Sequence, residues 1–168
     1  FSSMEVVNFP EYIESLARIF DAAGVSWTIS SEAFEATNAG IQIGSKEAAK
    51  EIVSRSVNAA EKLGVKYLIS PECGHAYTAI RWEGPNLIGR AYKFEVVHIL
   101  ELLDQLQREG RLKLTGKTDT PMTLHDPCQI VRRGGVIEPP RNLLLQVASG
   151  FVETTDHGTM NWCCGGGG

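Results

Sequence analysis

The sequence lacks the features that would assign it to several common protein classes. No hydrophobic run approaches the roughly 18 residues that a membrane-spanning helix needs, and no segment is rich in lysine and arginine. The net charge of −4 argues against broad nucleic-acid binding. Four cysteines in 168 residues are too few for a secreted disulfide scaffold. With 43% hydrophobic residues, the composition predicts a domain with a real core, in a reducing cytoplasmic compartment.

Familiar catalytic motifs are missing as well. The sequence contains no Gly-x-x-x-x-Gly-Lys phosphate loop, no Gly-x-Gly-x-x-Gly fingerprint and no clear Ser/His/Asp order. Nothing at its start is typical of a signal peptide. Because it starts at Phe1 and stops within a glycine run, we expect it to be a piece of a longer protein.

The most unusual stretch that is present is the end, where Cys163 and Cys164 precede four glycines. Adjacent cysteines seldom bond to each other, but both can reach one metal centre, and glycines let the chain fold closely around it. A further cysteine, Cys128, is separated from this doublet by 34 residues. Two interpretations remain open. The doublet is either a pair of buried thiols before a flexible tail, or half of a metal–thiolate site.

Hydrophobic periodicity predicts strands and helices in alternation. Helices are expected at 10–23, 45–63, 71–82, 99–110, from 127 to the break at 132–136, and at 139–148. Strands are expected at 25–30, 65–70, 94–98, 121–125 and 151–155, with a short extended piece at 112–114 and loops at 31–44 and 84–92. Alternation with short links indicates an α/β fold, a mostly parallel sheet flanked by helices.

A weak internal repeat divides the sequence into two halves. Residues 10–30 and 139–156 share an order of proline, amphipathic helix, small residues before a glycine, and strand. Aligning Gly24 with Gly150 places the cysteine doublet opposite Thr37-Asn38. If the halves are related, the first has lost its doublet.

The isolated cysteines Cys73 and Cys128 each follow a predicted strand and precede a predicted helix. Sites in α/β folds lie at the carboxyl ends of strands, so we expect both to converge with the doublet on one edge. Free amides at a helix start would stabilise a thiolate at Cys128. His75 and His125 are close in sequence to these cysteines and are candidate proton donors. For each side chain the alternative is a buried or structural role.

These residues resemble the cysteine-rich CCG domain of the B and D subunits of heterodisulfide reductase. The resemblance is carried by His125-Asp126-Pro127-Cys128, the long spacer, and Cys163-Cys164-Gly165-Gly166-Gly167-Gly168. The family pattern continues with a second spacer and Cys-x-x-Cys. Two further stretches, Ser70-Pro71-Glu72-Cys73-Gly74-His75-Ala76-Tyr77 and Trp82-Glu83-Gly84-Pro85-Asn86, are most similar to the DsrK subunit of the sulfite-reduction-associated membrane complex.

The resemblance implies two pseudo-repeated CCG halves. Residues 1–115 would be a first half with degenerate ligands, and residues 116–168 the start of a second half that stops before its Cys-x-x-Cys. In this family five cysteines hold a noncubane [4Fe-4S] cluster. The cluster is expected in the full-length protein, and in this piece it could be absent or replaced by zinc.

Carried over residue by residue, the resemblance makes Cys128, Cys163 and Cys164 the expected cluster ligands. Cys73 is the fourth expected cluster and metal ligand, because it matches the last thiol of the first half's Cys-x-x-Cys, in which Ser70 takes the place of the other thiol.

The implied function is that of a heterodisulfide-reductase-like oxidoreductase subunit, inactive in this piece alone. It would pass electrons to a disulfide or trisulfide substrate, with His75 or His125 supplying a proton. The implied partners are other subunits of an electron-transfer complex, including a membrane quinone-interacting subunit, and a small sulfur-carrier protein, with no nucleic acid. The expected location is cytoplasmic, on the inner face of the membrane through a partner subunit. The alternative is a non-catalytic assembly module with a structural metal or none.

Overall fold

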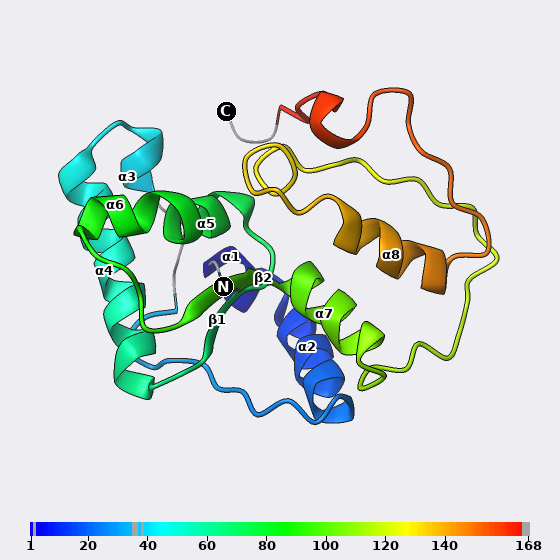
Figure 1. The fold of residues 1–168 in the computed structure, drawn as a ribbon, viewed down its shortest axis with the longest axis horizontal. Helices are drawn as coiled ribbons and strands as arrows, with labels where there is room; N and C mark the ends of the chain where they lie inside the picture. Colours follow the sequence, from blue (N-terminus) through cyan, green and yellow to red (C-terminus); the bar gives the residue numbers. More distant parts are fainter. Residues whose placement is uncertain (2, 35–36, 38, 166–168) are drawn as a thin grey trace.

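The computed structural model describes residues 1, 3–34, 37 and 39–165 (Figure 1). Its elements in order are α1 (Ser3–Asn8), α2 (Pro10–Ala22), α3 (Ala39–Gln42), α4 (Lys46–Leu63), β1 (Tyr67–Ser70), α5 (Gly74–Thr78), the π-helical turn η1 (Ala79–Glu83), α6 (Gly84–Ile88), β2 (Glu95–His98), α7 (Ile99–Arg108), α8 (Glu138–Val147) and the 3-10 turn η2 (Gly158–Met160). The fold is α/β, as predicted from the alternation of strands and helices.

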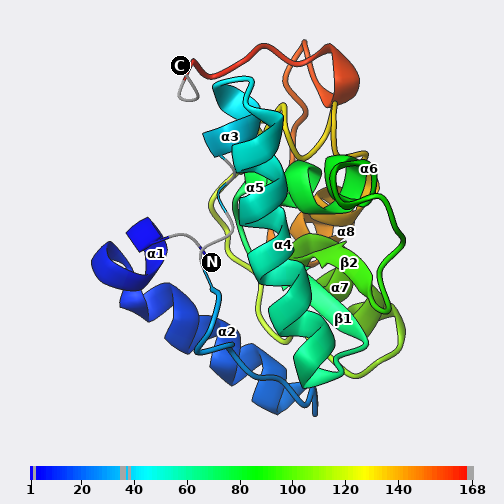
Figure 2. The same ribbon diagram turned by 90° about the vertical axis from the view of Figure 1, so that its left-hand side faces the viewer.

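A parallel pair of strands, β1 and β2, lies between two hydrophobic cores. Tyr67 pairs with Glu95 and Ser70 with His98, so both strands end at the same edge. Successive strand residues point to opposite faces. One face packs against α4 and the α5–α6 segment, and the other against α2 and α7 (Figure 1). Figure 2 shows α1 and α2 projecting from one side of the molecule. Within the described part of the chain, no helix has the length and apolar character needed to cross a bilayer.

Local signals explain the helices that the sequence predicts. Pro10 lies in the first turn of α2, where its missing amide hydrogen is not needed. The Ser45 hydroxyl caps α4 by accepting a hydrogen bond from Ala48 N at 3.2 Å. Gly64 ends that helix with a φ of 65°, a conformation that side chains disfavour. These helices begin and end within a residue or two of the predicted positions.

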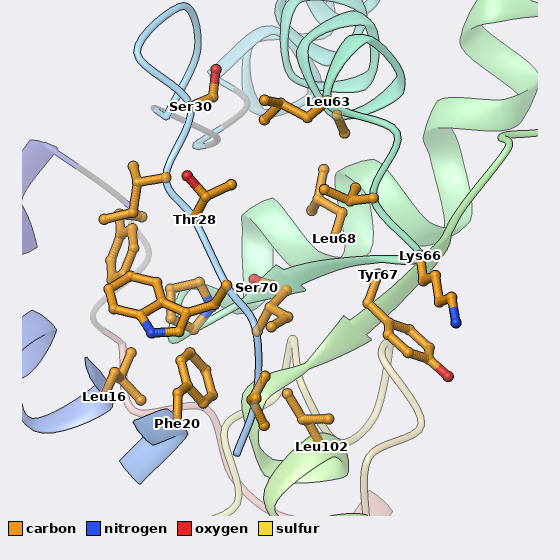
Figure 3. Close-up of a pocket in the computed structure, with 18 of the residues that line it drawn as sticks. Leu16, Phe20, Thr28, Ser30, Leu63, Lys66, Tyr67, Leu68, Ser70 and Leu102 are labelled. Atoms are coloured by element: carbon orange, nitrogen blue, oxygen red, sulfur yellow. The ribbon is translucent and has the colours of Figure 1, made fainter. Parts of the chain in front are cut away.

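The predicted strand at 25–30 is wrong. The segment makes no strand pairing and lies beside the free edge of β1. Figure 3 shows Thr28 and Ser30 across a pocket of about 640 Å³ from β1. Trp27 packs instead against Phe20 of α2, with 5.7 Å between the ring centroids. Partial burial of Val25 and Trp27 therefore accounts for much of the alternating pattern without a ladder of hydrogen bonds.

Two further expectations about strands are wrong. The predicted strands at 121–125 and 151–155 are reduced to one isolated parallel bridge between Met122 and Phe151. The predicted extended piece at 112–114 forms no strand either. Among the described residues, only β1 and β2 carry a continuous ladder.

The predicted loop at 84–92 is wrong over its first part, because the chain stays helical to the end of α6 at Ile88, and the loop covers only 89–92 of that range. The wide π-helical turn η1 precedes Pro85, which lies in the first turn of α6, where proline is tolerated. Gly84 leaves room for a neighbouring segment. A Cβ at this position would collide with the hydroxyl of Tyr92, which donates a hydrogen bond to Ile80 O at 2.7 Å. Tertiary packing thus overrides the turn signal of the Gly-Pro-Asn sequence.

A buried histidine, His98, caps α7. Its Nδ1 accepts a hydrogen bond from Leu100 N at 3.3 Å, and the Glu101 carboxylate accepts one from the His98 amide at 2.8 Å. The ring is 2% exposed and lies edge-on to Tyr77, at 5.4 Å between centroids. Burial lowers the pKa of His98, against the opposing effects of the Glu72 carbonyl and Glu101. The fold therefore holds the neutral ring.

We expect the chain to lose stability as the pH falls below about 6.5, the ordinary pKa of histidine. The unfolded chain binds a proton there, whereas folded His98 stays neutral until its lower pKa is reached. Protonation would also remove the Nδ1 acceptor. His98→Asn keeps a good N-cap residue, so its thermal unfolding temperature should depend less on pH between about pH 5 and 8. His157→Asn, at an exposed histidine, is the matched control. Equal pH dependence in wild type and His98→Asn would contradict the assignment.

Candidate metal–thiolate site

Cys128 lies in a series of turns, and the helix predicted to follow it is absent. Residues 128–134 form wide turns, in which Arg133 N donates to Cys128 O at 3.1 Å. Asp126 does not act as an N-cap, because its carboxylate binds Arg141. The expected stabilisation of a Cys128 thiolate by a helix start is therefore missing, and burial raises the pKa of this thiol.

The structure brings the Cys128 thiol into direct interaction with the cysteine doublet. Cys163 and Cys164 are exposed, and Cys163 Sγ accepts a hydrogen bond from Gly165 N at 3.4 Å. This bond, the Cys128 thiol and the charge of Arg132 lower the pKa of Cys163. Burial is the largest cause that raises the pKa of Cys128, and hydrogen bonding to Cys163 is the second. When one of the two thiols ionises, Cys163 is therefore the one that carries the negative charge.

Cys73 lies next to this group, but its sulfur serves another purpose. Its Sγ accepts a hydrogen bond from Ala76 N at 3.4 Å and so caps α5. The following residue, Gly74, packs directly on the turn after Cys128, where an added Cβ would lie 2.7 Å from Gln129 Cβ. Among the described residues, no hydrogen bond joins the Cys73 sulfur to the other thiols. The backbone thus brings Cys73 beside the Cys128 turn, but its sulfur takes no part in the interaction between Cys128 and the cysteine doublet.

The two candidate proton donors are next in the sequence to segments that meet at the Cys128 turn, because Gly74, beside His75, packs on Gln129 and His125 precedes Cys128 by three residues. His75 is partly buried in the first turn of α5, and His125 is exposed just before the Cys128 turn. Among the described residues, neither imidazole makes a hydrogen bond or an ion pair.

A buried ion network under the turn was missed by sequence reasoning. The Arg141 guanidinium binds both Asp126 oxygens, at 2.9 and 2.7 Å, and Glu153 Oε1 at 2.7 Å. Asp126 Oδ2 also accepts a hydrogen bond from Gly158 N at 2.5 Å. The bond to Arg141 is the main cause that lowers the pKa of Asp126. Proximity of Asp126 to Cys128 in the sequence was the only available signal, and it suggested a helix cap instead.

The donor set fits part of a metal–thiolate centre. The Cys128 thiol interacts with Cys163, and Cys164 is adjacent to Cys163 in the sequence. Thiolate sulfur is the ligand that iron–sulfur clusters and structural zinc use. Within the described residues, no group of three or more His, Cys, Asp or Glu side chains is already arranged to hold a metal ion. Gly166, Gly167 and Gly168, which follow the doublet, lie outside those residues. The sulfur atoms of Cys128, Cys163 and Cys164 would therefore have to move closer together when a metal binds.

Comparisons with known proteins identify the family. The model of the CCG cysteine-rich domain matches residues 3–80 and 122–168. An EtfAB:quinone oxidoreductase of Syntrophomonas wolfei is 33% identical over 156 residues, which cover 92% of this chain and 21% of that protein. The D subunit of the dihydromethanophenazine:CoB–CoM heterodisulfide reductase of Methanosarcina acetivorans is 31% identical over 157 residues, which cover 90% and 38% of the two chains.

A third relative carries iron–sulfur in its name. The Hdr-like menaquinol oxidoreductase iron-sulfur subunit 2 of Archaeoglobus fulgidus is 29% identical over 180 residues, which cover 86% of this chain and 32% of that protein. The chain thus spans between 21% and 38% of the length of these three relatives. No solved structure matches it significantly. The matched segments contain Cys73, Cys128, Cys163 and Cys164. This chain belongs to the CCG cysteine-rich domain family and is homologous to the D subunit of heterodisulfide reductase and to Hdr-like oxidoreductase subunits.

Proposed function

We propose that the chain is part of an iron–sulfur oxidoreductase subunit in which Cys128, Cys163 and Cys164 bind a noncubane [4Fe-4S] cluster. The observation that carries the proposal is the direct interaction of Cys128 with Cys163, two thiols far apart in the sequence. Such a cluster would supply electrons one at a time. The iron–sulfur and oxidoreductase names of the relatives favour this chemistry over a purely structural metal.

The proposed division of the chain follows the family pattern. Residues 1–115 would form a first CCG-like half with degenerate ligands, and residues 116–168 would begin a second half. Thr37-Asn38 would stand where the first half has lost its doublet, although Asn38 lies outside the described residues. Cys73 would then be what remains of the first half's ligands, held at the rim of the second half's site.

The proposed substrate is a disulfide or trisulfide, on a small sulfur-carrier protein or free. Exposure of Cys163 and Cys164 leaves the thiol group open to such a molecule. Reduction of a disulfide consumes two electrons and two protons and yields two thiols. His75 and His125 are close in sequence to Cys73 and Cys128, and either could donate a proton to the leaving thiolate. The electrons would come from a quinol or a ferredoxin-type donor through partner subunits, one of them membrane-bound, at the cytoplasmic face.

Anaerobic reconstitution with ferrous iron and sulfide tests the proposal on a longer chain that also carries the Cys-x-x-Cys of the family pattern. The chain should retain iron and acid-labile sulfide together after desalting, and a paramagnetic signal should develop on oxidation. Iron and sulfide would both be absent if the chain is an assembly module, and one zinc per chain without a signal would identify a structural metal. Either result would overturn the redox function.

A further inference from the structure

We propose that Arg132 and Asn161 form a latch that holds the Cys163–Cys164 turn against the Cys128 turn, and so positions the thiols before any metal binds. The latch would be a pair of positioning residues and would not touch the substrate. Its benefit for cluster binding rests on the proposed function, whereas the positioning of the thiols does not.

Apolar packing does little to hold the doublet in place. Between residues 157 and 165, only Gly158 and Asn161 are buried. The large side chains of this stretch point to solvent, since Met160 is 75% exposed and Trp162 is 76% exposed. Polar contacts must therefore fix this segment to the rest of the chain.

Asn161 and Arg132 supply those contacts from opposite turns. Asn161, which is 3% exposed, donates from Nδ2 to the backbone oxygen of Asp126. Arg132 donates from Nε to Thr159 O at 2.9 Å, and from Nη2 to Asn161 Oδ1 at 3.1 Å and to Asn161 O. The two segments lie side by side in Figure 1, in yellow and red. Each side chain thus crosses from one thiol-bearing turn to the other, close to Cys128 and Cys163.

The planar shape of the Arg132 guanidinium allows its positioning role to be tested separately from its charge. Arg132 uses two different nitrogens on two residues, and a lysine ammonium cannot reproduce this planar fork. The adjacent Arg133 provides a control of equal charge and similar exposure. Its contacts lead away from the doublet, to Gln129 Oε1 at 3.4 Å and Glu83 Oε1 at 3.5 Å. Loss of Arg133 removes the same charge without opening the latch.

A thiol–disulfide equilibrium with glutathione measures the positioning directly. In a chain that also carries Cys73→Ser and Cys164→Ser, oxidised glutathione takes up two electrons from Cys128 and Cys163, which form one disulfide and release two glutathione thiols. The equilibrium constant is the effective concentration of one thiol at the other. We expect Arg132→Met and Asn161→Ala to lower it by at least about tenfold, and Arg133→Met to change it by less than about twofold.

Arg132→Lys decides whether the shape of the guanidinium or only its positive charge holds the two turns together. If it lowers the effective concentration as far as Arg132→Met, the fork positions the turns. Wild-type behaviour of Arg132→Lys, or an equal loss in Arg133→Met, would show that charge alone matters and would overturn the latch. Should Arg132→Met fail to fold, as judged by its thermal transition, Arg132→Lys and Asn161→Ala carry the test.

Titration with Cd²⁺ alone gives a second readout on the chain with all four cysteines. Thiolate-to-metal absorption should need a higher Cd²⁺ concentration in Asn161→Ala than in wild type, and unchanged titration would count against the latch. The outcome is separable from the proposed function. A high effective thiol concentration in the wild-type chain, with no uptake of iron and sulfide by the longer chain that carries the family's Cys-x-x-Cys, would keep the latch and end the cluster assignment.

Discussion

Replacing Cys128 by serine is expected to abolish the uptake of iron and sulfide by the longer chain that carries the family's Cys-x-x-Cys, whereas Cys73→Ser should retain much of it. The Cys128 thiol interacts directly with Cys163, while the Cys73 sulfur caps α5. Removing a supporting residue around a metal typically costs 10–100-fold in affinity, so loss of a direct ligand should cost at least about 100-fold. Iron and acid-labile sulfide per chain, measured after anaerobic reconstitution and desalting, check the result.

Cys73→Ser is a well-matched control for this experiment. Serine is a good N-cap residue, so the start of α5 should survive the change. Both variants should therefore unfold at similar temperatures, and a difference in metal uptake reports on the site. Equal losses in the two variants would place Cys73 among the ligands and contradict the arrangement of three interacting thiols.

Replacing Arg141 by methionine should destabilise the chain by about 3–5 kcal/mol, as expected when one partner of a buried ion pair is removed. The Arg141 side chain is 11% exposed and that of Asp126 is 0% exposed, so the change would leave a buried carboxylate without its counter-ion. The free energy of unfolding from urea titration measures the effect. The matched control is Arg55→Met, whose ion pair with Glu51 is exposed on both sides and should be worth less than about 1 kcal/mol.

A double variant tests the reason for the Arg141 effect. Asp126→Asn removes the carboxylate charge and keeps an oxygen for Gly158 N. Adding it to Arg141→Met should restore part of the lost stability, because no unpaired charge stays buried. A purely additive loss in the double variant would mean that packing of the arginine stem, rather than its charge, holds the network together.

The accuracy of the sequence predictions depended on whether a signal was local. Ser45 and Gly64 mark the ends of α4 through their own hydroxyl and backbone conformation. The segment at 25–30 and the helix through Gly84 depend on distant partners. Trp27 packs on α2, and the space left by Gly84 is filled by the Tyr92 hydroxyl. No neighbouring residue in the sequence reports such contacts.

The candidate site shows the same division. Sequence reasoning named all four thiols and both histidines, because sulfur and imidazole carry recognisable chemistry wherever they lie. It assigned no positioning role to Arg132, Arg141 or Asn161, since arginine and asparagine are ordinary in loops until tertiary contacts bury or engage them.

The sequence by itself determined the family, the α/β alternation and the set of sulfur atoms available. Only the tertiary structure decided which thiols meet and what Asp126 does. An N-cap is worth about 1 kcal/mol, whereas an unpaired buried arginine would cost several times more. Asp126 therefore binds Arg141 instead of starting a helix. No helix therefore starts at Cys128, and the cysteine doublet lies against the turns that form there instead.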